Sequence, residues 1–413
     1  MFTNRDLDDL KCRGIPPADA KRQLGLFSNP PPPIELFRPC IVDDGIIRLD
    51  EVDQDALERE GAEALASGRV GKFVPASGAA SRMFQGLRAA PENPAIRDIR
   101  AQLGRFAFAP ALVGEADPIS AILRLYAPLP KALLAFHRYG DHSRTALEEH
   151  LQEAHTLGVA WLHFTVPPEH RTDFTAAAER CAVSVTTSYS EQMPFTDTLA
   201  GRDDGQPFRG ADNRLVFRPG GHGALLENLN NLRGDLILIK NIDNITHSRL
   251  WPEQVRWKKI LLGVLLRARA PDRPTRVCGV VKNSGEPGGG PFWVRRRDGC
   301  ETLQIVESAQ VDLTVPTQKA LFDSATHFNP VDLACSVRDA SGRPFDLRAF
   351  RDDQAVFLTR KFKDGEPLRA LELPGLWNGA MAYWHTVFVE VPVETFNPVK
   401  TLADLLRPAH QPA

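Results

Sequence analysis

Apolar and β-branched residues recur along the chain in short runs, and amphipathic stretches separate these runs. The runs predict buried strands at residues 69–74, 159–166, 235–242, 276–282 and 386–393. The amphipathic stretches predict helices at residues 51–68, 144–156 and 169–181. Because helices alternate with the first strands, the pattern predicts an α/β fold with a mostly parallel, Rossmann-like central sheet.

The two ends of the chain differ from this middle part. Residues 1–28 predict a short helical segment, and the prolines at 30–33 predict a stiff linker after it. The last third has more turn signals and predicts a mixed α+β C-terminal portion. We therefore expect three parts: a helical segment with its linker at 1–68, a core at 69–300 and a C-terminal portion at 301–413.

The first predicted core strand runs into an unusual loop. The apolar run Val70–Val74 ends in a series of tiny residues, and Arg82 follows them. Small residues let successive backbone N–H groups point into one concavity, and such nests bind phosphate, which the guanidinium of an arginine also suits. Tight packing explains the loop alone equally well. The candidate nucleotide ligands here are Ala76, Ser77, Gly78, Ala79 and Ser81.

Composition narrows the class of protein. The chain of 413 residues has a net charge of −2, so its overall charge indicates neither a nucleic-acid nor a membrane-surface partner. The six cysteines are scattered without a C-x-x-C pair, which argues against a disulfide framework and a structural zinc site. The polar N-terminus lacks the pattern of a signal peptide, and no apolar run has membrane-spanning length. We expect a soluble cytoplasmic protein.

A candidate metal ligand follows the strand predicted at 235–242. Residues 235–240 of this strand lead into Asn241, Ile242, Asp243 and Asn244. In open α/β sheets, ligands bind beyond the carboxyl ends of the strands, and carboxylate oxygen is the ligand that Mg²⁺ prefers. Asp243 is therefore the candidate magnesium ligand. Capping of a helix N-terminus is its alternative role.

Two further segments have the composition of a nucleotide pocket. Glycines surround a histidine in Gly221, His222 and Gly223, just before a predicted helix, where backbone can approach an anionic or flat group. Upstream, Gln192 lies in a polar loop, and its amide offers a donor and an acceptor that suit an imide edge such as that of uracil. A plain surface position is the alternative for Gln192.

These motifs together resemble the UDP-sugar pyrophosphorylases. The loop from Ala76 to Met83, with Pro130-Lys131 after it, is similar to that family's small-Gly-x-Gly-Ser/Thr-Arg signature and its Pro-Lys. The similarity continues through 189–194, 219–223, 241–244, 303–308 and the Phe-x-Pro-Val-Lys-Thr-x-x-Asp-Leu-Leu segment at 396–406. Ala80, in place of the second glycine, and an insertion at about 84–128 depart from the family pattern. The whole chain also resembles a bacterial family described only as a domain of unknown function.

The resemblance implies a GT-A-type, Rossmann-like nucleotidyltransferase with Mg²⁺ as cofactor and with a nucleoside triphosphate, here UTP, and a sugar 1-phosphate as substrates. It implies that Arg82, Lys131 and Lys400 meet phosphate. It further implies that Glu307 binds sugar hydroxyls, and Asn329 lies in a segment with a fainter similarity on the sugar side. A GT-A glycosyltransferase and a non-catalytic nucleotide-binding protein remain alternatives, and the oligomeric state stays open.

Overall fold

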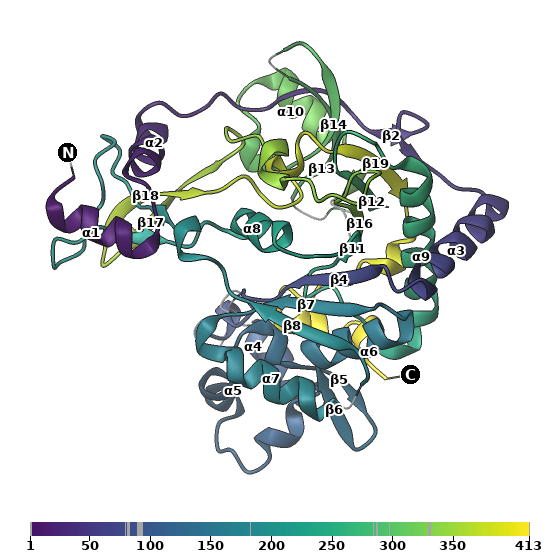
Figure 1. Ribbon diagram of the computed structural model, residues 1–413. Coiled ribbons are helices and arrows are strands. Elements are labelled where there is room, and N and C mark those ends of the chain that lie inside the picture. Colours follow the sequence, from purple (N-terminus) through teal and green to yellow (C-terminus); the bar gives the residue numbers. More distant parts are fainter. Residues whose placement is uncertain are drawn as a thin grey trace.

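A ten-stranded sheet runs through the described part of the molecule (Figure 1). The computed structural model describes residues 2–78, 80, 83–88, 94–181, 183–283, 285, 288–296, 298–328 and 332–412. Nine strands form the sheet's continuous path, and β15 (His327–Phe328) pairs with β12 at its side. The order along the path is β2 (Ile41–Val42), β3 (Gly45–Ile47), β19 (His385–Glu390), β12 (Thr275–Lys282), β16 (Leu333–Ser336), β11 (Leu236–Ile239), β4 (Val70–Pro75), β7 (Trp161–Thr165) and β8 (Thr186–Ser190).

Most neighbouring strands in this sheet run parallel. The four strands β11, β4, β7 and β8 form one parallel block, and β12, β19, β3 and β2 form another. Strand β16 joins the blocks and is antiparallel to both of its neighbours. The predicted α/β class with a mostly parallel sheet is confirmed, and the five predicted strands correspond to β4, β7, β11, β12 and β19.

Alternation along the strands divides the core into two faces. On β4, Val70 and Val74 lie in one buried cluster with helices α3, α6 and α9, whereas Phe73 lies in a second cluster with α8. Because successive side chains of a strand point to opposite faces, both faces of this sheet must be covered. The covering helices are α3 (Glu51–Ala66), α6 (Ala146–Leu157), α8 (Leu225–Asn230) and α9 (Trp251–Ala268).

Smaller units surround the main sheet. Strands β1 (Glu35–Pro39), β13 (Gly290–Arg295) and β14 (Glu301–Val306) form an antiparallel sheet. Three antiparallel pairs add β5 (Ala135–Tyr139) with β6 (His142–Thr145), β9 (Thr198–Leu199) with β10 (Phe217–Arg218), and β17 (Phe357–Lys363) with β18 (Glu366–Glu372). The remaining helices are α1 (Asn4–Arg13), α2 (Pro17–Ser28), α4 (Pro94–Ala101), α5 (Pro118–Tyr126), α7 (Arg171–Arg180) and α10 (Pro316–Asp323). None of the helices in the described ranges has the length and apolarity needed to cross a bilayer.

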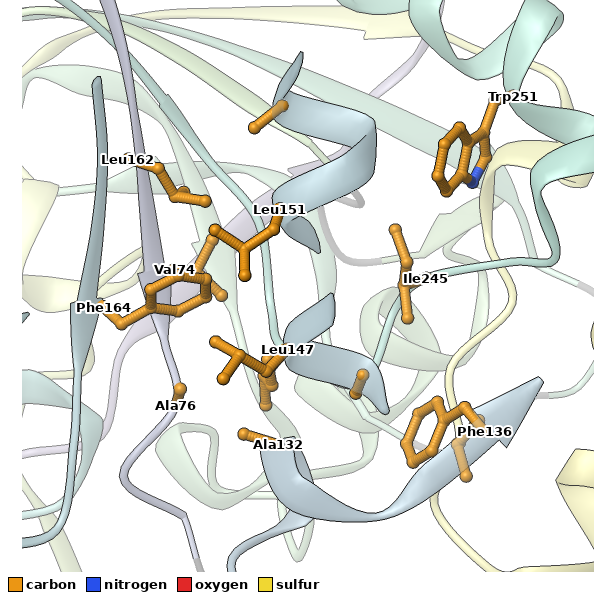
Figure 2. Close-up of a cluster of buried hydrophobic side chains, with 14 of the residues drawn as sticks. Val74, Ala76, Ala132, Phe136, Leu147, Leu151, Leu162, Phe164, Ile245 and Trp251 are labelled. Atoms are coloured by element: carbon orange, nitrogen blue, oxygen red, sulfur yellow. The ribbon is translucent and has the colours of Figure 1, made fainter. Parts of the chain in front are cut away.

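A hydrophobic cluster supports the loop that follows β4 (Figure 2). Leu147 of α6 lies near Ala76, the first residue after β4, and near Ala132, which follows Lys131. All three side chains are fully buried. The cluster therefore holds the small-residue loop and the Pro-Lys segment against one helix.

Charged side chains are buried on the same face of the sheet. Lys72 of β4 lies between Val70 and Val74 and pairs with Glu153 of α6, and neither side chain is exposed to solvent. Lys240 and Lys258 approach the same carboxylate at 3.3 and 2.9 Å. Such ions are retained in a core only when they are paired, so this network ties β4, β11, α6 and α9 together.

Candidate active site

The loops that carry the predicted ligands meet at one edge of the parallel block. Ala76, Gln192 and Asp243 follow the carboxyl ends of β4, β8 and β11 respectively. Because these strands are parallel and belong to one continuous block, their carboxyl ends lie at the same edge. This is the edge at which open α/β sheets bind their ligands.

Asp243 lies between two lysines at this edge. The Nζ atoms of Lys131 and Lys400 donate to the same oxygen, Oδ2, at 3.0 and 2.8 Å. Lys131 also donates to the backbone carbonyl of Val399 at 2.8 Å. The aspartate is 7 % exposed, whereas the Lys400 side chain is 61 % exposed. Three predicted residues from distant parts of the sequence are thus in direct contact, with one more positive than negative charge.

The electrostatics of Asp243 suit an ionised ligand group. Burial alone would raise the pKa of Asp243, but the ammonium groups of Lys400 and Lys131 outweigh it and hold that pKa below its ordinary value. Its other oxygen, Oδ1, is buried and has no hydrogen-bond partner within the described ranges. A buried oxygen of this kind can coordinate a cation, because the remaining ligands of Mg²⁺ are commonly waters and substrate phosphates.

No group of three or more His, Cys, Asp or Glu side chains suitable for a metal occurs in the part of the chain that the structure describes. An ion at Asp243 would therefore not be enclosed by three or more such side chains of the described residues. The residues present fit a magnesium that substrate phosphates help to bind, and they do not form a closed metal cage.

The loop after β4 is in contact with the Pro-Lys segment. The backbone N–H of Lys131 points to the carbonyl of Gly78 at 3.5 Å, and the N–H of Ala76 donates to the carbonyl of Thr165 at 3.1 Å. Gly78 is exposed, and a Cβ placed on it would meet no atom of the described residues within 4 Å. Gly78 thus lies beside the backbone of Lys131, and the nucleotide-binding roles of Ala76, Ser77 and Gly78 stay predictions. Ala79, Ser81, Arg82 and Asn329 lie outside the described residues, and their assigned roles stay predictions.

The segment that carries Lys400 is fastened across the site. We call residues 395–411 the C-terminal strap. The N–H of Val399 donates to the carbonyl of Asp243 at 2.9 Å, and the N–H of Asn397 donates to Asn244 Oδ1 at 2.9 Å. Asp404 accepts from the N–H of Lys400 at 2.8 Å and fixes the next turn. Asn244 therefore holds the strap beside Asp243.

The two predicted nucleotide-pocket segments lie beside each other. Gln192 precedes β9, which pairs with β10, and β10 leads directly into Gly220 and Gly221. A Cβ on Gly220 would lie 2.4 Å from the carbonyl oxygen of Thr196, so the two segments touch through backbone. Gly221 has φ +73°, and a Cβ there would lie 2.7 Å from a carboxylate oxygen of Glu372. Glycine is required at Gly221 by conformation and by space.

His222 packs against the segment after β18. Its Nδ1 accepts from the N–H of Leu376 at 3.0 Å, and its ring stacks on Trp377 with centroids 4.6 Å apart. Burial lowers the pKa of His222 to about 4, so the ring is neutral at physiological pH. One ring nitrogen is thus committed to the protein backbone. Nucleotide binding by Gly221, His222 and Gly223 stays a prediction.

Glu307 lies at the end of β14, next to a carboxylate that sequence reasoning missed. Burial raises the pKa of Glu307, and the negative charge of Glu372 raises it further. Glu372 ends β18 and also borders Gly221, so it links the predicted sugar-side residue to the glycine segment. In the sequence Glu372 stands in an ordinary strand pattern, and no local signal identifies it.

Comparisons with solved structures find the same fold elsewhere. A uridine diphosphate N-acetylglucosamine pyrophosphorylase from Trypanosoma brucei is 14% identical, with 94% of this chain and 74% of that chain covered and a TM-score of 0.55. A mutant of UDP-glucose pyrophosphorylase from Leishmania major, solved with UDP-glucose, is 15% identical, with 98% and 79% covered and a TM-score of 0.54. A putative UDP-N-acetylglucosamine pyrophosphorylase from Entamoeba histolytica is 12% identical, with 85% of this chain and 80% of that chain covered and a TM-score of 0.53. At these identities the likeness establishes the fold.

Sequence comparison establishes the family. No curated protein sequence matches the chain significantly. A family model described as "Domain of unknown function (DUF4301)" matches residues 3–107, 121–271 and 267–411, which is nearly the whole chain. The protein therefore belongs to the DUF4301 family, whose member described here has the fold of the UDP-sugar pyrophosphorylases.

Proposed function

We propose that this protein is a nucleotidyltransferase that joins UTP to a sugar 1-phosphate and releases pyrophosphate. The observation that carries the proposal is the convergence of Lys131 and Lys400 on Asp243, beside the small-residue loop at the carboxyl edge of the sheet. Two cations, a buried carboxylate and exposed backbone at one point form a site for a polyphosphate with its metal.

The chemistry proposed here needs positioning more than acid–base catalysis. The nucleophile is an ionised phosphate oxygen of the sugar phosphate, which attacks the α-phosphorus of the triphosphate in line. The new P–O bond forms as the bond to the bridging oxygen of pyrophosphate breaks, so no proton has to move. Lys131 and Lys400 offset the charge on the phosphates, and the fold holds the reacting groups in line.

Asp243 would hold Mg²⁺ through its free Oδ1, and the ion, when bound, neutralises phosphate charge. In the same proposal, Gln192 and residues 220–223 receive the base, while Glu307 faces the acceptor sugar. Arg82 would add a further cation to the triphosphate. Burial lowers the pKa of His222 to about 4, which makes its ring a weak proton acceptor and accords with a reaction that uses no general base.

The test is magnesium-dependent pyrophosphate release from purified protein, with each of the four ribonucleoside triphosphates and a panel of sugar 1-phosphates. Release with UTP and one acceptor would support the function and identify the substrate. If the protein instead hydrolyses a nucleotide sugar or transfers its sugar, and releases no pyrophosphate from any triphosphate, the result would indicate a glycosyltransferase. Lys131→Met serves as the matched variant with an expected loss of activity, because it removes one ammonium group and keeps an unbranched side chain of similar length.

A further inference from the structure

The N-terminal helix α1 is attached to the rest of the protein by three ion pairs. Asp6 pairs with Arg209 at 2.7 Å, and Asp9 accepts from Arg214 Nε at 3.1 Å. Arg13, the last residue of α1, pairs with Asp197 at 2.5 Å. Figure 1 shows α1 and α2 at one side of the molecule, beside the hairpin β17–β18.

The pair between Arg13 and Asp197 differs from the other two because it reaches the candidate site. Arg13 binds Oδ2 of Asp197, and the other oxygen, Oδ1, faces Nε2 of Gln192 at 3.5 Å. The guanidinium of Arg13 also lies over the ring of Phe217, 4.3 Å from its centroid. Phe217 begins β10, the strand that leads into Gly220. One arginine thus contacts both Asp197, which faces Gln192, and Phe217, which starts the strand before the glycine segment.

A carboxylate beside an amide decides which way the amide points. An ionised carboxylate only accepts hydrogen bonds, so it selects the NH₂ end of the glutamine and turns Oε1 away. The Asp197 side chain is 18 % exposed, and its bond to Arg13 keeps the carboxylate in place. A glutamine held in this way presents an acceptor and one N–H in a fixed arrangement. A free glutamine can exchange the two ends by rotation.

Uracil and cytosine differ in the groups that such an amide reads. Uracil presents an N–H donor between two carbonyl acceptors, whereas cytosine presents an unprotonated ring nitrogen beside an amino donor. An amide that can turn over accommodates both edges, and an amide that cannot turn favours one. On the basis of the function proposed above, we propose that Asp197, held by Arg13, is a positioning residue that fixes the Gln192 amide and thereby makes the site select between UTP and CTP.

The experiment measures the preference for UTP in magnesium buffer as the dissociation constant for CTP divided by that for UTP. Where turnover occurs, the preference is also measured as kcat/KM for UTP divided by kcat/KM for CTP. We expect Asp197→Asn to lower the wild-type preference about tenfold, because asparagine can face Gln192 with either end of its amide. Arg13→Met should also lower the preference for UTP. Because the Arg13 side chain is 39 % exposed, this variant serves as the second test if Asp197→Asn folds poorly. Arg13→Lys should restore most of the preference.

Matched variants separate positioning from simple anchoring of α1. Asp9→Asn breaks a neighbouring ion pair of the same helix and should leave the UTP-to-CTP ratio unchanged. Gln192→Leu should lower the ratio, and adding Asp197→Asn to it should change nothing further, because Asp197 acts through Gln192. The positioning role would be overturned if the wild-type protein had no preference for UTP over CTP, or if Asp197→Asn left that preference unchanged. Binding of neither triphosphate would overturn the proposed function itself, and binding without turnover still decides the positioning role through the dissociation constants.

Discussion

Lys131 and Lys400 donate to the same oxygen of Asp243, although they come from the middle and the end of the chain. The backbone carbonyl of Val399 accepts from Lys131 as well, so the C-terminal strap completes the environment of both lysines. The three charges therefore form one unit, and the site exists only when the strap is in place beside the carboxyl end of β11.

Replacing Asp243 by asparagine should abolish most of the activity and leave the fold intact. The variant keeps the shape of the side chain but removes the negative charge that holds two ammonium groups and, as proposed, a magnesium ion. We expect kcat/KM to fall by about 100-fold or more, in line with the loss of a single electrostatic contact in other active sites. Pyrophosphate release and circular dichroism measure the two effects.

Asp235→Asn is the matched control for this prediction. Asp235 immediately precedes the same strand, β11, and it also lies between two cations, Arg69 and Arg269. Its position at the amino end of the strand places it at the opposite edge of the sheet from Asp243. Activity should persist in this variant. A comparable loss in both variants would mean that Asp243 acts on the fold and not on the reaction.

A methyl group on Gly78 should impair nucleotide binding without affecting the fold. A Cβ there meets no atom of the described residues within 4 Å, and Gly78 is not among the glycines with positive φ. The melting temperature of Gly78→Ala should therefore stay close to that of the wild type. The dissociation constant for the triphosphate should rise about tenfold, because the methyl group would occupy the side from which phosphate approaches the backbone.

Gly71→Ala, in the strand β4 that precedes the loop of Gly78, gives the contrasting result. A Cβ on Gly71 would lie 2.0 Å from the ring of Trp161 on the neighbouring strand. Overpacking of this kind costs about 1–3 kcal/mol, so this variant should lower the free energy of unfolding. Chemical denaturation distinguishes the two glycines. Equal destabilisation in both variants would contradict the proposed ligand-binding role of Gly78.

Local pattern was enough to predict five strands of the main sheet and the helices α3, α6 and α7, but the core helix α9 was not predicted. The run at 69–74 and the amphipathic stretch at 144–156 are β4 and α6, because each buries one consistent set of side chains. The position of Asp243 at a strand end was also predictable, because the edge rule depends only on strand direction. These features follow from neighbours in sequence.

Long-range pairing could not be read in the same way. Strand β16 inserts between β11 and β12 in the antiparallel direction, and no feature of residues 333–336 specifies this position. The contact between Arg13 and Asp197 likewise joins a terminal helix to a central loop. Such contacts depend on how complete elements pack, so a single sequence without its fold does not reveal them.

Removing the charge of Glu153 should destabilise the protein far more than removing a lysine beside it. Glu153 lies within 3.3 Å of the Nζ atoms of Lys72, Lys240 and Lys258, and all four side chains are almost fully buried. Glu153→Gln leaves the ammonium groups with much less compensation, and breaking a buried pair costs about 3–5 kcal/mol. The free energy of unfolding in urea measures this loss.

Lys72→Met is the partner experiment. Burial lowers the pKa of Lys72, so its charged form is costly in the native protein, although Glu153 offsets part of that cost. Methionine fills a similar volume without a charge, and Glu153 keeps Lys240 and Lys258 as partners. We expect a change of less than about 1.5 kcal/mol in either direction. A larger loss than in Glu153→Gln would contradict this account of the network.

Acid should loosen the C-terminal strap through His410. The ring of His410 is 1 % exposed and lies 2.9 Å from Nε2 of His137, which in turn contacts Glu149. Burial, together with His137, lowers the pKa of His410 to about 3, against about 6.5 in an unfolded chain. Above pH 6.5 both states are neutral, and stability does not depend on this group. As the pH falls from 6.5 towards 3, only the unfolded strap takes up the proton, so the docked state loses stability.

The charged groups of the strap itself act in opposite directions on His410, since Asp404 raises its pKa and Arg407 lowers it. The protection factors of residues 395–411, which correct for the intrinsic pH dependence of amide exchange, should therefore fall below about pH 6.5 in the wild type. His410→Gln should flatten this dependence, whereas His142→Gln, at an exposed position on β6, should leave it unchanged. Because Lys400 belongs to the strap, catalytic activity should fall over the same range in the wild type. Protection factors that stay constant with pH, or the same acid response in His410→Gln, would show that His410 does not control the docking of the strap.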